Sequence, residues 1–271
     1  MRTVGRALLG FVTKDLMLMA SYRFATALAI IEVVSGLLIY FFIDRLFGQE
    51  VVGYLEPYGV GYFAYVLLGL ALFSFMGTGL SGLAAQVNWE QVTGTLEAIL
   101  ATPLRPAILA VGLSLSGVLY ACGEMAGYLL LGAVVLGAPV GNANFLSAAV
   151  ILLLAVVSFN SLGLLAASVI VVFKRGNPVA WIFQGVAGLL GGVYFPVEVL
   201  PDWLQTLSAL VPVTYAVRGL QLAVYQGASL PTLWGEILPL AFLSAVLLPL
   251  GLFSFAASIR RAKRDGSLAH Y

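Results

Sequence analysis

Long apolar runs, separated by short segments that hold most of the charged residues, dominate this chain. An apolar run of about 20 residues lets an α-helix cross the hydrocarbon core of a bilayer, and a helix satisfies its own backbone hydrogen bonds there. We therefore expect an all-α membrane protein in which residues 1–271 form one transmembrane domain. The pattern predicts six spans: residues 24–43, 58–85, 106–136, 144–173, 178–195 and 233–257.

The composition supports this assignment. Hydrophobic residues make up 61% of the chain and charged residues 9%, whereas a soluble domain carries roughly 25% charged residues. The surface of this protein must therefore face lipid. The net charge of +1 gives no footprint for nucleic acid, and the single cysteine, Cys122, allows neither an intrachain disulfide nor a CxxC site.

The basic residues predict the orientation of the spans. Every Lys and Arg except Arg45 and Arg218 falls on one side of the predicted spans. Because cytoplasmic loops carry the excess of Lys and Arg, we expect both termini in the cytoplasm and residues 44–57 outside. We expect a multi-pass membrane protein, in a bacterial or archaeal plasma membrane.

Two amphipathic segments are predicted on the cytoplasmic side. Residues 1–23 contain a helical pattern over 4–22 that suits an interface helix lying along the membrane, with a frayed basic leader as the alternative. The loop 86–105 predicts a short helix, ended by Pro103, that either offers its polar face to a partner or is an ordinary solvated connector. Its apolar face comprises Trp89, Val92, Leu96, Ile99 and Leu100, and its polar face comprises Glu90, Gly94 and Glu97, flanked by Gln91 and Thr95.

The outer segment 196–232 is unusually apolar for a loop. Pro201 precedes a predicted short helix that reaches about residue 210, and Pro212 begins a second that ends near Gly227. Two short apolar helices predict a re-entrant hairpin that dips into the outer leaflet. A seventh span over 210–227 is the alternative, but it would place the basic C-terminal segment outside.

The search for catalytic groups returns mainly absences. No GxxxxGK[ST] phosphate loop occurs, so the chain has no means of hydrolysing ATP alone. The only histidine, His270, lies next to the C-terminus, which leaves none for a Ser-His dyad or an HExxH zinc site within the spans. We therefore expect a protein that is not an enzyme and binds no metal or cofactor of its own. An intramembrane enzyme is disfavoured for the same reason.

Two carboxylates, Glu32 and Glu124, lie within predicted spans. A charge inside the bilayer costs several kcal/mol, so each group must face protein or water, or be protonated. Either they relay protons, as in a proton-coupled secondary carrier, or they make packing-level hydrogen bonds to a neighbouring helix. We favour hydrogen bonding, because no Lys, Arg or His lies mid-span to extend a proton path.

The span 178–195 combines glycines with Trp181, Phe183 and the amide of Gln184. Such a helix suits the wall of a path for apolar substrates, and equally an ordinary helix contact. GxxxG patterns at Gly123–Gly127 and Gly188–Gly192 suit close helix packing, but such patterns are common by chance in a chain with 30 glycines.

Two sequence motifs resemble those of one family. The stretch 90–103 (EQVTGTLEAILATP) is similar to the region between the second and third spans of type-2 ATP-binding-cassette (ABC) exporter permeases. The stretches 191–201 (GGVYFPVEVLP) and 210–219 (LVPVTYAVRG) resemble that family's second signature. The likeness extends over nearly the whole chain and does not specify a substrate.

This resemblance implies a permease that works as a dimer, more often of identical chains, with two separate ATPase subunits that hold ATP and magnesium. It makes residues 89–102 a coupling helix seated on the ATPase. Relatives often carry a second charged residue where this chain has Gln91, which affects that one polar contact. The coupling residues are then Glu90, Gln91, Gly94, Thr95 and Glu97, and the substrate path, between spans two and five, involves Phe73, Phe75, Trp181, Phe183 and Gln184. The expected cargo is amphiphilic: a drug-like compound, a lipid or a lipid-linked glycan.

Overall fold

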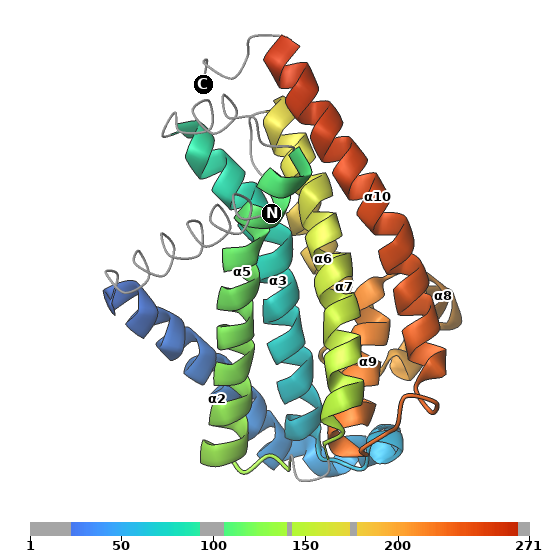
Figure 1. Ribbon diagram of the computed structural model, residues 1–271. Helices are drawn as coiled ribbons and strands as arrows, with labels where there is room; N and C mark the ends of the chain where they lie inside the picture. The colour runs from blue at the N-terminus through green and yellow to red at the C-terminus, as the bar shows by residue number, and fades with distance from the viewer. Residues whose placement is uncertain (1–22, 93–105, 140–142, 174–177, 265–271) are drawn as a thin grey trace.

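A computed structural model describes residues 23–92, 106–139, 143–173 and 178–264, and within these ranges every regular element is helical. The all-α prediction is thus confirmed for the described part of the chain (Figure 1). The main helices are α2 (Arg23–Leu55), α3 (Tyr62–Val92), α5 (Pro106–Leu130), α6 (Phe145–Phe173), α7 (Pro178–Leu190), α8 (Asp202–Ser208), α9 (Pro212–Tyr225) and α10 (Trp234–Arg264). Three short helical segments join them: η1 (Glu56–Tyr58), η2 (Leu131–Val135) and η3 (Val197–Val199).

Within the described residues, four helical segments are long and apolar enough to cross a membrane. A fifth is obtained if α8 and α9, which meet at 89°, count as one broken span. The apolar part of α7 is short, and α2 contains the predicted span 24–43. The four segments are Tyr62–Gly82, Gly117–Val135, Phe145–Val172 and Trp234–Arg261.

Several predicted boundaries need correction. Helix α2 continues beyond the predicted span 24–43 as far as Leu55, so most of the segment 44–57, expected outside the membrane, is helical. Helix α3 continues to Val92, so Glu90 and Gln91 end a long helix rather than begin a separate one. The rest of the predicted coupling helix and the interface helix over 4–22 lie outside the described residues. Helix α7 ends at Leu190 instead of 195, because Gly192 takes a left-handed backbone conformation (φ 69°) that ends a helix.

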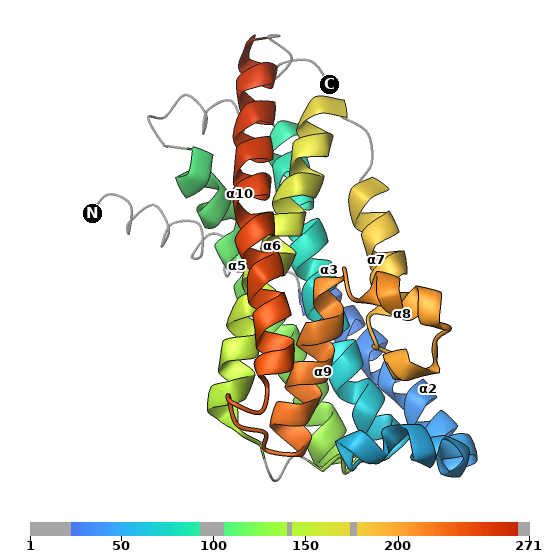
Figure 2. The same ribbon diagram turned by 90° about the vertical axis from the view of Figure 1, so that its right-hand side faces the viewer.

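Helix α3 lies at the centre of the bundle, where it packs against α5, α6, α9 and α2, while α6 also packs along α10 (Figures 1 and 2). Small residues bring these backbones close together. A Cβ atom added at Gly163 of α6 would collide with the carbonyl oxygen of Gly79 in α3. On the other side of α6, the hydroxyls of Ser158 and Ser244 share a hydrogen bond of 2.7 Å with α10. Close packing of this kind is the main source of helix association where no water is present to drive it.

The two short helices predicted for 196–232 are present as α8 and α9. With 14 residues, α9 is too short to cross a bilayer alone, and the bent α8–α9 pair fits either a re-entrant hairpin or one broken span. Its side chains tie the hairpin to the bundle: Gln221 Nε2 donates to the Tyr65 carbonyl (3.0 Å), and the Tyr225 hydroxyl donates to the Ala64 carbonyl. Ser208 of α8 donates to the Leu190 carbonyl at the end of α7 (2.6 Å). The hairpin is therefore fixed to both α3 and α7.

Candidate functional site

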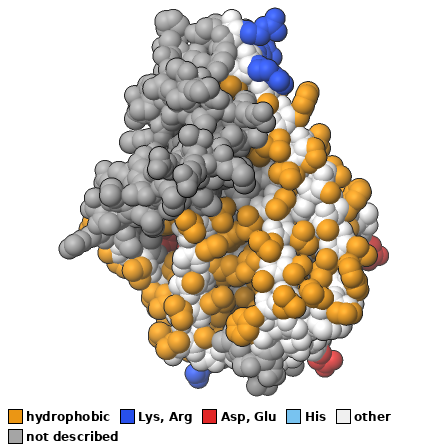
Figure 3. Space-filling view, viewed as in Figure 1, with side chains coloured by type: hydrophobic (Ala, Val, Ile, Leu, Met, Phe, Trp, Pro, Cys, Tyr) orange, Lys and Arg blue, Asp and Glu red, His pale blue; other side chains and the backbone are white. Residues whose placement is uncertain are grey.

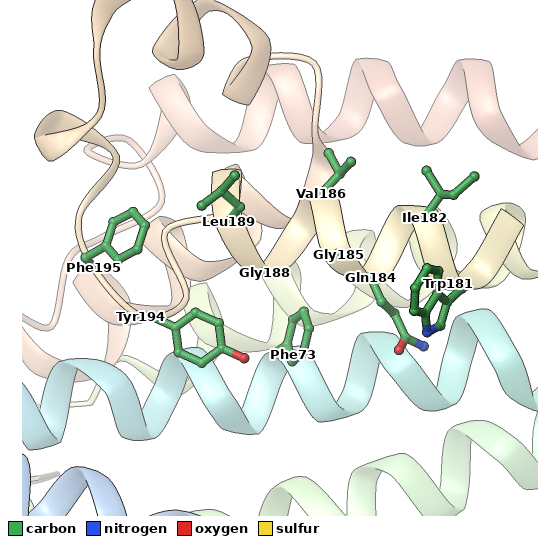
Figure 4. A pocket seen from close by; sticks show the side chains of 10 residues that line it. All are labelled: Phe73, Trp181, Ile182, Gln184, Gly185, Val186, Gly188, Leu189, Tyr194 and Phe195. Carbon is green, nitrogen blue, oxygen red and sulfur yellow. The ribbon is translucent and has the colours of Figure 1, made fainter. Parts of the chain in front are cut away.

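An open pocket of about 710 Å³ lies between α3 and α7. Figure 4 shows Phe73 of α3 and Trp181, Gln184 and Tyr194 of α7 and its following loop turned toward the space between the two helices. We call this feature the α3–α7 groove. Its lining comprises Phe73, Trp181, Ile182, Gln184, Gly185, Val186, Gly188, Leu189, Tyr194 and Phe195.

Aromatic rings form one end of the α3–α7 groove. The ring of Tyr194 stacks on Tyr40 of α2, with centroids 5.9 Å apart and planes 19° from parallel. On its other side it meets the ring of Phe73 at 6.1 Å in a tilted arrangement. Gly188 lies beside both rings, since a Cβ there would be in ordinary contact with Phe73 (3.4 Å) and Tyr194 (3.5 Å). This end therefore offers a rigid apolar surface.

The other end of the groove carries Trp181 and the amide of Gln184. Trp181 is 82% exposed, which is far more than an indole ring packed into a core would be. Gln184 Nε2 donates a hydrogen bond to Ser81 of α3 (3.0 Å), which holds the amide across the groove. No charged side chain lines the groove. The arrangement thus suits a largely apolar molecule with a few hydrogen-bonding groups.

The structure separates the predicted path residues into two groups. Phe73, Trp181 and Gln184 line the groove. Phe75 is only 1% exposed and packs against Phe159 in the core, and Phe183 also packs on core residues. Sequence reasoning missed Tyr194, although it stands within the stretch 191–201 that carried the family resemblance.

The outer wall of the groove is exposed and apolar. Ile182, Val186 and Leu189 are exposed on α7, and Figure 4 shows Ile182 and Val186 pointing away from α3. On the face shown in Figure 3, apolar side chains cover much of the described surface, and basic side chains gather where α10 ends. Such a surface requires lipid or another protein against it.

The two intramembrane carboxylates have different environments. Glu124 accepts hydrogen bonds from Ser74 (2.5 Å) and Thr78 (3.3 Å), both on α3. Glu32 is exposed on α2. Glu124 therefore makes hydrogen bonds to a neighbouring helix, which is the arrangement that the packing interpretation predicted.

The predicted coupling residues are only partly described. Glu90 and Gln91 lie in the last turn of α3, beyond the apolar part of that helix. Gly94, Thr95 and Glu97 lie outside the described residues. Their role in contacting an ATPase stays a prediction.

Comparison with known families decides the broad class. A family model described as ABC-2 type transporter matches residues 12–225, which include α2 through α9 and both walls of the α3–α7 groove. The chain belongs to the ABC-2 type transporter family. As an ABC-2 type transporter it is a multi-pass membrane protein that acts as a transmembrane permease. Permeases of this family normally work with ATPase subunits. A comparison with curated proteins gives no match.

Proposed function

We propose that this ABC-2 type transporter is the non-catalytic permease of an ATP-driven exporter that moves amphiphilic molecules outward. In this proposal α2, α3, α5, α6, α7 and α10 supply the six spans, and both termini face the cytoplasm of a bacterial or archaeal cell. The α8–α9 hairpin dips into the outer leaflet without crossing it. The observation that carries the proposal is the α3–α7 groove, a large apolar surface within the family's membrane domain.

A second copy of the chain completes the path in this proposal. The groove is open on the exposed side of α7, so a single chain offers only one wall to a substrate. A twofold axis would place two identical grooves opposite each other, as symmetric homodimers commonly do. The exposed indole of Trp181 and the apolar face of α7 would then be covered by the partner or by substrate.

The substrate class follows from the lining. Aromatic and aliphatic walls favour an apolar body, and the Gln184 amide and Tyr194 hydroxyl give a few hydrogen bonds for orientation. Drug-like compounds, lipids and the lipid part of a lipid-linked glycan share this chemistry. The energy for transport comes from ATP and magnesium bound to the partner ATPase subunits. ATP can shift the permease between two states only through a subunit that binds ATP and is coupled to the permease.

The groove assignment predicts a large effect of Trp181→Ala on transport. Removing a large apolar contact costs about 1.5–3 kcal/mol, so the apparent affinity for a fluorescent amphiphilic dye should fall by tenfold or more. Uptake of the dye into inside-out vesicles containing the permease and its ATPase measures this.

Phe75→Ala is the matched control for the groove. Phe75 is an aromatic residue two positions from Phe73 but faces the core. Its truncation should lower the free energy of unfolding by about 3–5 kcal/mol, while correctly folded molecules keep their affinity. Equal affinity of wild type and Trp181→Ala would contradict the assignment of the groove as the path.

A second prediction separates the exporter from a proton-coupled carrier. Glu124→Gln keeps an acceptor for the Ser74 hydroxyl, so ATP-dependent transport should change by less than about threefold. A carrier driven by protons through Glu124 and Glu32 would instead lose transport in this variant and would need no ATPase. Uptake should be measured with ATP alone and with a proton gradient alone.

A further inference from the structure

A second, smaller pocket lies near the α8–α9 hairpin, away from the α3–α7 groove. Its volume is about 230 Å³, below the roughly 300–1,000 Å³ usual for drug-sized ligands. Its lining residues come from η1, the first turn of α3, the segment after α7, α8 and α9. We call it the hairpin pocket; its lining includes Tyr58, Tyr65, Glu198, Gln205, Thr214 and Arg218.

Arg218 holds the hairpin pocket's positive charge and is shared between two carboxylates. Its Nε lies 3.3 Å from Glu236 Oε1, and its NH1 lies 3.3 Å from Glu198 Oε1. Glu236 has a side chain that is 14% exposed, whereas those of Arg218 and Glu198 are 49% and 51% exposed. The contact with Glu198 is therefore a solvent-accessible ion pair of low energy, which a ligand can replace.

The arginine keeps donor capacity for an anion. A guanidinium has five N–H groups, and the two contacts at 3.3 Å are longer than the 2.7–2.9 Å usual for strong charge-assisted bonds. A phosphate would offer Arg218 a shorter, two-pronged contact. That exchange would free the Glu198 carboxylate to accept a cation a few ångströms away.

The surroundings of the Glu198 carboxylate suit an ammonium as that cation. Tyr58 and Tyr65 meet edge to face with centroids 5.0 Å apart, and both are buried. Burial raises the pKa of Tyr58 to about 12, so its phenol stays protonated and neutral. The Glu198 carboxylate is the main partner for an alkylammonium group, because Tyr58 is only 4% and Tyr65 only 1% exposed; the rings supply an apolar, neutral wall beside it.

Two exposed tryptophans lie close in sequence to residues of the hairpin pocket or to the partner of Arg218. Trp203, near the start of α8, and Trp234, at the start of α10, are both exposed. Exposed tryptophans of membrane proteins gather at the membrane–water interface. Glu236, which binds Arg218, is two residues from Trp234. This proximity favours a lipid headgroup as the ligand of the pocket.

We propose that the hairpin pocket binds a zwitterionic phosphoethanolamine headgroup, with its phosphate on Arg218 and its ammonium on Glu198 beside the Tyr58–Tyr65 wall. One ligand would thereby replace a single exposed ion pair by two complementary contacts. The headgroup can belong to a membrane lipid or to a soluble glycerophosphoethanolamine. This site is separate from the groove and does not depend on the direction of transport.

Binding to the purified full-length chain in detergent tests this proposal. The probes are a short-chain phosphatidylethanolamine, a phosphatidylglycerol of the same chain length, soluble glycerophosphoethanolamine, and ethanolamine. Phosphatidylethanolamine should bind wild type at least about tenfold tighter than it binds Glu198→Gln or Arg218→Gln, a difference equivalent to about 1.4 kcal/mol. Native mass spectrometry and thermal stabilisation give two independent readouts.

Two charge-neutralising variants outside the pocket serve as controls. Arg45→Gln and Asp202→Asn remove charges from exposed residues that do not line it and should bind like wild type. Glu198→Gln removes no packing, so it keeps the test valid if Arg218→Gln fails to fold. If the soluble headgroup binds with the same dependence on Glu198, the site recognises the headgroup from either source. If only the lipid binds, the ligand of the site is a membrane lipid.

Three results would overturn the proposal. Equal phosphatidylethanolamine binding by wild type and Glu198→Gln would remove the ammonium site. Equal binding of phosphatidylglycerol and phosphatidylethanolamine would show that the anion alone is recognised. Equal binding of ethanolamine would show that Arg218 contributes nothing to recognition.

Discussion

Gly163→Ala should lower the free energy of unfolding by about 1–3 kcal/mol, the usual cost of overpacking a tight interior. The loss runs against helix propensity, because alanine stabilises a helix by about 1 kcal/mol relative to glycine. The reason is that the new Cβ would collide with the Gly79 carbonyl oxygen, and α3 and α6 would have to separate. Unfolding of the purified chain in detergent, followed by tryptophan fluorescence, measures the change.

Gly123→Ala is the control for this experiment. Gly123 also lies within a helix, but an added Cβ there meets nothing within 4 Å. Only the difference in helix propensity between glycine and alanine should therefore change the free energy of unfolding, and the variant should be as stable as wild type or slightly more stable. Equal effects of the two substitutions would show that the α3–α6 contact is looser than described.

The helices that the sequence predicted best are those with clear ends. Pro106 begins α5 at the predicted residue, and α6 runs from Phe145 to Phe173 against a prediction of 144–173. Pro201 and Pro212 likewise located α8 and α9. Proline fixes its own backbone angle and suits a first helical turn, so such helix boundaries can be predicted from the local sequence. The end of α7 was missed because a glycine inside an apolar run does not reveal its backbone conformation.

Contacts between helices were much harder to predict. Among the described residues, the GxxxG pattern at Gly123–Gly127 meets no neighbouring atom within 4 Å. In contrast, Gly79 and Gly163, for which the sequence predicted no helix contact, bring α3 and α6 together. The role of a glycine in packing depends on which helices face each other. That arrangement is a property of the whole bundle and is not encoded in a local pattern.

The same reason explains the mixed outcome at the groove. Phe73 and Phe75 lie about 200° apart around α3, so one faces the groove and the other the core. A helix that is apolar on all sides has no hydrophobic periodicity to distinguish these faces. Gln184 was found because an amide inside an apolar span stands out.

Gly94→Trp and Glu97→Lys should each reduce ATP-dependent transport by about tenfold or more while the protein remains inserted in the membrane. A coupling free energy of 1–3 kcal/mol between two sites corresponds to about 5–150-fold in the coupled equilibrium. Both residues belong to the polar face of the predicted coupling helix, which would seat on the ATPase. An indole would block close approach at Gly94, and a reversed charge at Glu97 would repel any basic partner group.

The measurement compares ATP hydrolysis with dye uptake in the same vesicles. Uncoupling means that hydrolysis persists, or that the ATPase fails to co-purify, while uptake falls. Gly53→Trp and Glu56→Lys make the same changes at exposed positions in the last turn of α2 and in η1, near the opposite end of α3, and should leave uptake unchanged. Normal uptake by both coupling variants would contradict the coupling role of residues 89–102. In that case the ATPase would have to act through another cytoplasmic segment, and the N-terminal residues 1–23 would be the next to test.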